Sequence, residues 1–127
     1  MLTATRTTRV LSDHFEPEAA LSPEETRKLR GHLEQIDYAA FAANREVLSG
    51  IMGRVDVGRF EKLAVATAHA RAKWVTASLS ITENSHSVTQ DQIAQLAILR
   101  NGYEELSEAY EAMRRMVERG YLGYGPR

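Results

Sequence analysis

The chain of 127 residues contains no cysteine, only three prolines and no long hydrophobic run. The absence of cysteine excludes disulfides, thiolate catalysis and cysteine-held metal sites. No apolar stretch approaches the roughly 18 residues that span a bilayer, so we expect no membrane segment. The formal net charge of −1 provides no global field toward nucleic acid or an anionic surface, and we expect neither as a partner.

The remaining composition is that of a globular protein, with 43% hydrophobic and 26% charged residues, and the length suits one domain. The first residues lack the apolar region of a secretory signal, so we expect a cytoplasmic protein. Residues 1–21 show no helical period and lean toward extended structure between Thr3 and Leu11. We expect an N-terminal arm here, with apolar anchors at Val10, Leu11, Phe15 and Leu21.

The first helix is predicted over about 23–49. Ser22 can cap it, Pro23 suits its first position, and Glu25 completes a capping box. Gly50 is the predicted residue after its last turn. Its apolar seam, at alternating spacings of three and four, comprises Leu29, Leu33, Ile36, Ala40, Ala43 and Val47.

The second helix is predicted over about 57–83, with Asp56 as its cap. Its seam keeps the same alternation and comprises Phe60, Leu63, Thr67, Ala70, Trp74, Ala77 and Ile81. Thr67 is polar, but its hydroxyl can bond a carbonyl one turn back and needs no functional role.

The third helix is predicted over about 90–119, capped by Thr89 with Gln92 and stopped by Gly120. Asn101-Gly102 is a local turn signal, but the seam crosses it in phase, so we expect a continuous helix, bent at most. The seam comprises Leu96, Leu99, Tyr103, Leu106, Tyr110, Met113 and Val117.

Three helices of similar length with short connections predict an all-α fold, an antiparallel up-down-up three-helix bundle. The predicted division is an arm at 1–21, a bundle at 22–120 and a tail at 121–127. The tail is apolar enough at Tyr121, Leu122 and Tyr124 to fold back on the bundle.

Helices one and two each carry a second apolar stripe beside the seam, which indicates burial on two sides. Either the arm and tail cover it, or another subunit does, and we expect a homodimer. The candidate interface residues are Tyr38, Phe41, Leu48, Ile51, Met52, Ala64, Ala68, Val75 and Leu79.

Charge is also sorted between the helices. Basic residues gather on and before helix two (Arg54, Arg59, Lys62, Arg71 and Lys73), and acidic residues gather on helix three (Glu104, Glu105, Glu108 and Glu111). These groups could pair within the bundle, pair across an interface, or form two solvated faces.

No motif indicates a catalytic, cofactor or metal site. The stretch Glu83 to His86 matches one Glu-x-x-His half of a di-iron site, which needs two such motifs and inward glutamates. We therefore expect a non-enzymatic, self-associating helical protein that acts as an interaction, adaptor or chaperone-like module. The alternative is a small-molecule or signalling bundle that uses an inter-helix pocket or His69.

Overall fold

A computed structural model describes residues 21–126, and this part of the chain forms three α-helices and no strand beyond a single β-bridge. The helices are α1 (Pro23–Met52), α2 (Val57–Asn84) and α3 (Gln90–Glu118). The predicted all-α, three-helix class is confirmed. The predicted arm and its anchors Val10, Leu11 and Phe15 lie outside the described residues.

The chain divides into two compact units, residues 1–38 and residues 39–127, and each is described by itself. In the first unit, α1 begins with the predicted capping box. The Ser22 N–H donates to Glu25 Oε1 at 3.0 Å, and the Glu25 N–H donates to Ser22 Oγ at 3.0 Å. The bond from the Ser22 amide also lowers the pKa of Glu25 below its ordinary value.

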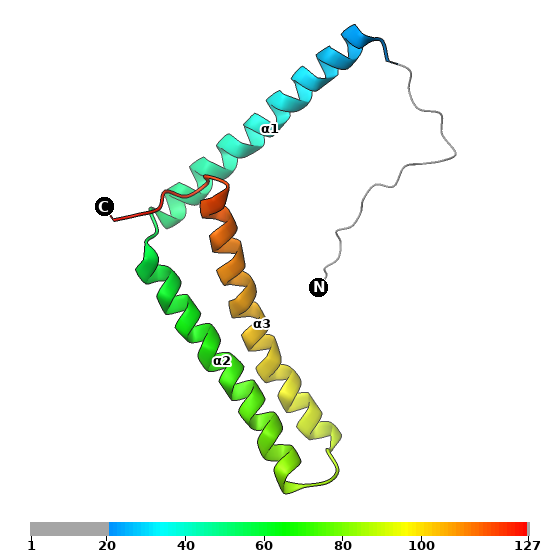
Figure 1. Cartoon of the computed structure of the whole chain (residues 1–127), viewed down its shortest axis with the longest axis vertical. Helices are drawn as coiled ribbons and strands as arrows, with labels where there is room; N and C mark the ends of the chain where they lie inside the picture. The colour runs from blue at the N-terminus through cyan, green and yellow to red at the C-terminus, as the bar shows by residue number, and fades with distance from the viewer. Residues whose placement is uncertain (1–20, 127) are drawn as a thin grey trace. The chain divides into compact units, whose positions relative to one another are not determined.

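In the second unit, α2 and α3 pack side by side as an antiparallel hairpin (Figure 1). The seams predicted for both helices meet between them, because all their members are buried or half-buried. Phe60 meets Tyr110 edge-on, with ring centroids 5.6 Å apart, and Trp74 stacks on Tyr103 at 5.8 Å. The helix α3 runs without interruption through Asn101-Gly102, as predicted.

Both ends of the hairpin carry the predicted caps. Asp56 Oδ1 accepts from the Arg59 N–H at 3.2 Å, and Thr89 with Gln92 forms a complete capping box. The end of α3 at Gly120 has a φ of 81°, where the absence of a Cβ avoids strain. There the Tyr121 N–H donates to the Met116 carbonyl at 2.8 Å, which satisfies a carbonyl of the last turn.

The buried core of the described residues consists of Val55, Met113 and Leu122. Val55 lies between α1 and α2, and Leu122 lies in the tail. The Val55 N–H donates to the Gly123 carbonyl, and the Gly125 N–H donates to the Val55 carbonyl, both at 3.0 Å. The tail therefore folds back onto the helical unit, as predicted.

The end of α1 differs from the prediction. Gly50 does not end the helix, which continues to Met52 and stops at Gly53, whose φ is 70°. The extra turn lets Met52 pack against the core, beside Leu48 one turn earlier.

The predicted seam of α1 is not its contact face in this unit. Val47 is 55% exposed, whereas Phe41 and Leu48, from the second stripe, are half-buried. The tail explains the difference, because Tyr121 packs on Phe41 with ring centroids 5.7 Å apart. The seam residues Leu29, Leu33 and Ile36 of the first unit are exposed as well.

Candidate interaction surface

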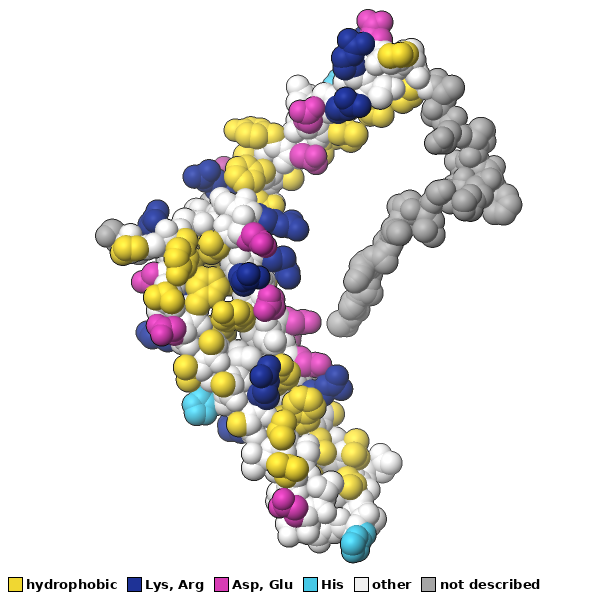
Figure 2. All heavy atoms as spheres, viewed as in Figure 1, with side chains coloured by type: hydrophobic (Ala, Val, Ile, Leu, Met, Phe, Trp, Pro, Cys, Tyr) yellow, Lys and Arg dark blue, Asp and Glu magenta, His cyan; other side chains and the backbone are white. Residues whose placement is uncertain are grey.

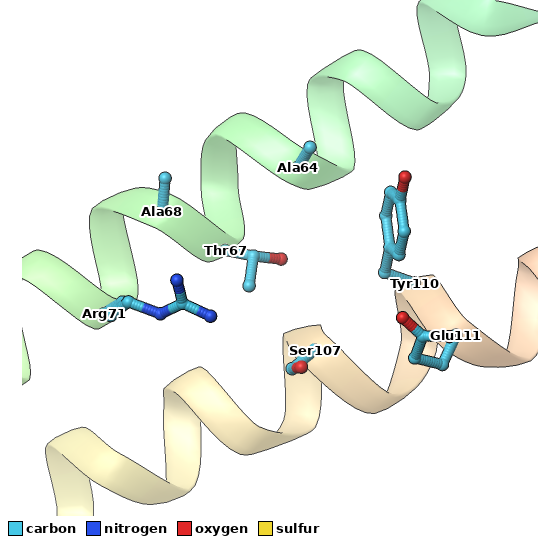
Figure 3. Close-up of a pocket in the computed structure, with 7 residues that line it drawn as sticks. All are labelled: Ala64, Thr67, Ala68, Arg71, Ser107, Tyr110 and Glu111. Carbon is cyan, nitrogen blue, oxygen red and sulfur yellow. The ribbon is translucent and has the colours of Figure 1, made fainter.

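One long face of the α2–α3 hairpin is hollowed by two grooves. The first has a volume of about 240 Å³, and α2 and α3 both contribute its lining side chains (Figure 3). The second, of about 380 Å³, lies farther toward the start of α2 and shares Tyr110 with the first. The first groove is lined by Ala64, Thr67, Ala68, Arg71, Ser107, Tyr110 and Glu111, and the second by Val57, Phe60, Tyr110, Arg114, Val117, Glu118 and Tyr124.

The rims of both grooves follow from the seams. A residue that directly follows a seam residue points to the side of the seam, about a quarter turn around the helix. On both α2 and α3 this is the side that carries the grooves. From Val57 to Val75 the row on α2 is Val57, Glu61, Ala64, Ala68, Arg71 and Val75; the last five directly follow a seam residue, and Val57 lies one turn before Glu61. From Arg100 to Glu118 the row on α3 is Arg100, Glu104, Ser107, Glu111, Arg114 and Glu118. We call these two rows together the grooved face.

Arg71 links the two helices at this face. Its Nη2 donates to the Tyr103 hydroxyl at 2.8 Å, and its guanidinium carbon lies 5.0 Å from the centroid of the Tyr103 ring. This hydrogen bond lowers the pKa of Tyr103 below its ordinary value, because the cation favours the ionised phenol. On the next turn, Arg100 lies over Trp74 at 5.7 Å and pairs with Glu104 at 3.1 Å.

The sorted charges do not pair between α2 and α3. Within residues 21–126 the only ion pair is Arg100–Glu104, which lies along α3 itself. Glu105, Glu108 and Lys73 are exposed, and Glu111 lines the first groove. Of the alternatives from the sequence, pairing within the bundle is thus not seen in this part of the chain.

The candidate interface residues fall into three places. In α1, Tyr38 and Ile51 are exposed, whereas Phe41, Leu48 and Met52 are half-buried beside the tail and the core. In α2, Ala64 and Ala68 line the first groove. Val75 and Leu79 are exposed, so the stripe of α2 stays uncovered by the described residues.

Apolar side chains also reach the surface elsewhere on the hairpin. Val65 is 56% exposed on α2, and Ile98 is 71% exposed on α3. Figure 2 shows hydrophobic side chains on the outside of all three helices, interleaved with charged ones. No helix among residues 21–126 is both long enough and apolar enough to cross a membrane.

Two polar side chains that line the first groove, Thr67 and Arg71, have structural partners. Thr67 Oγ1 donates to the Leu63 carbonyl at 2.7 Å, as its place on the seam suggested. His69 is exposed and does not line either groove. Among the described residues, no three histidine, aspartate or glutamate side chains gather as a metal site requires. The small-molecule alternative therefore stays a prediction.

The sequence reasoning missed Ser107, Arg114 and Glu61 as surface candidates. They could have been found, because each follows directly after a residue of the predicted seam. No protein-family model, curated protein or solved structure matches the chain.

Proposed function

We propose that this protein is a non-enzymatic helical interaction module that self-associates and, in the associated form, offers helical surfaces to a protein partner as an adaptor or chaperone does. The observation that carries the proposal is the contrast between long apolar seams and a very small core. Among residues 21–126 only Val55, Met113 and Leu122 are buried. A soluble chain of this length ordinarily buries roughly two thirds of its surface.

The uncovered apolar residues are better explained by association with another chain than by a lack of stable structure. The hairpin is capped at both ends and its two seams meet in phase, so the helices are well specified. The exposed residues lie on regular helical faces, as Val75 and Leu79 do on α2. A regular apolar face on a helix is the kind of surface that a second helix covers.

The charged groups support a binding role over catalysis. The pKa shifts of Glu25 and Tyr103 are both explained by structural bonds, to a helix cap and to an interhelical arginine. The side chains that line the first groove include one arginine and one glutamate, and the groove is open to solvent.

Self-association is tested by light scattering coupled to size-exclusion chromatography over a wide range of protein concentration. We expect a mass of about twice the 14.2 kDa of one chain at high concentration, and dissociation on dilution. A constant mass of one chain up to millimolar concentration would contradict the proposal.

A further inference from the structure

We propose that the grooved face is the site of self-association and that its occupant is the same face of a second copy, related by a twofold axis perpendicular to the helices. In this arrangement α2 lies antiparallel on α2 of the second copy, and α3 lies antiparallel on α3. The inference rests on the proposed self-association and assigns it a surface, an orientation and a register.

The first support is the order of residues along the row on α2. About its midpoint at Ala66, the row pairs alanine with alanine (Ala64 and Ala68), glutamate with arginine (Glu61 and Arg71), and valine with valine (Val57 and Val75). A twofold axis at the midpoint brings together the two members of each pair, one from each copy. Apolar residues then meet apolar residues, and the two charges of opposite sign meet.

The row on α3 has the same property. About its midpoint at Ala109, arginine is paired with glutamate (Arg100 and Glu118), glutamate with arginine (Glu104 and Arg114), and Ser107 with Glu111. Every charged residue of this row except Glu111 thus faces the opposite charge across the axis, and Glu111 faces a hydroxyl that can donate to it.

The two midpoints lie at one level of the hairpin, as a single axis requires. Ala64 and Ala68 line the first groove together with Ser107 and Glu111, so the inner pairs of both rows surround the same hollow (Figure 3). The axis therefore passes through this groove. The small side chains beside it allow two helices to approach closely.

The grooved face is also large enough for a dimer. From Val57 to Val75 it runs about 27 Å at 1.5 Å per residue, and two helices side by side are roughly 20 Å wide. That footprint of about 540 Å², before surface relief is counted, approaches the roughly 800 Å² per partner of specific interfaces. The exposed edge of a single helix would bury much less.

A twofold axis parallel to the helices fits less well. It would place α2 over α3 of the second copy, so Ala64 would face Glu111 and Val75 would face Arg100. Apolar residues would then meet charged ones. This arrangement pairs Glu61 with Arg114 instead of with Arg71, and that difference makes the orientation testable.

The test is a charge exchange at residues 61 and 71, read by sedimentation velocity at low ionic strength. Glu61→Arg places two arginines against each other at two symmetric contacts, and Arg71→Glu does the same with two glutamates. We expect each variant alone to raise the dissociation constant roughly 10- to 100-fold, and an equimolar mixture of the two to recover the wild-type value. The matched control is Lys73→Glu, an exposed base of α2 off the grooved face, which should leave the dissociation constant unchanged.

Each outcome decides between the possibilities. If Glu61→Arg is rescued by Arg114→Glu and not by Arg71→Glu, the axis is parallel to the helices and the orientation is wrong. If wild type dimerises and neither variant weakens it, the grooved face is not the interface, while the proposed self-association stands. Since Arg71 also bonds Tyr103, circular dichroism checks the fold of Arg71→Glu. Should that variant unfold, the equivalent exchange of Glu104→Arg with Arg114→Glu tests the same axis through α3.

Discussion

Replacement of Leu122 by alanine should release the tail from the helical unit. Leu122 is 4% exposed and is one of only three buried side chains among the described residues. A buried Leu→Ala change costs about 2–5 kcal/mol, and the tail can shift partly into the space, so we expect about 3 kcal/mol. That value corresponds to a change of roughly 150-fold in the equilibrium constant for opening.

Two measurements check this prediction. Urea unfolding followed by circular dichroism, at one fixed protein concentration, gives the change in the free energy of unfolding. Hydrogen exchange should accelerate at the amides of Val55 and Gly125, whose bonds hold the tail. The control is Ile98→Ala, since Ile98 is 71% exposed and the change should cost less than about 0.5 kcal/mol. A loss for Leu122→Ala below about 1 kcal/mol, or equal to that of the control, would refute the role of the tail.

Three further changes have expected outcomes. Thr89→Ala removes the side chain that caps α3 and should lower the unfolding free energy by about 1 kcal/mol in urea titration, whereas no loss would contradict the observed cap. Gly120→Ala forces a Cβ onto a φ of 81° and should cost about 1 kcal/mol by the same assay; a stabilised variant would contradict the strain. Arg71→Gln should raise the pKa of Tyr103 toward its ordinary value, as measured by NMR titration of ring-labelled tyrosine, and an unchanged pKa would show that the cation is not its cause. Because the folded-state pKa is the lower one, the contact with the ionised phenol stabilises the fold fully above the unfolded-state pKa and loses that effect as pH falls through the folded-state value.

The hairpin could be predicted from sequence because its signals are local. The repeat on α2 and α3 sets the inward face, Asp56 and Thr89 set the starts, and Gly120 sets the end. The connection at residues 85–89 is short, so the two helices must be antiparallel neighbours and their seams must meet. Each of these inferences needs only residues a few positions apart.

The surroundings of α1 could not be predicted in the same way. A repeat of apolar residues at spacings of three and four indicates that one face of a helix is suited to burial, but it does not indicate which surface covers that face. The contacts of α1 within residues 39–127 depend on the tail, which is distant along the chain, through pairs such as Ser49 and Tyr121. Two apolar stripes were available on α1, and the tail packs on the one that includes Phe41 and leaves Val47 exposed.

The grooved face lies between these two cases, and the reason matters for the proposed dimer. The residues of this face can be predicted from the seams, and the order of charges within each row can be read from the sequence alone. The register between the two rows cannot be predicted in this way, because a connection such as residues 85–89 would also allow α2 and α3 to shift along each other. A slip of one turn, about 5.4 Å, would separate the midpoints of the two rows, and one twofold axis could no longer serve both. The contact of Phe60 with Tyr110 and the stack of Trp74 on Tyr103 hold the rows in register. These four rings lie inside the hairpin and belong to neither row of the grooved face. Their contacts nevertheless determine whether the charges of both rows can pair with the opposite charges of a second copy about one twofold axis.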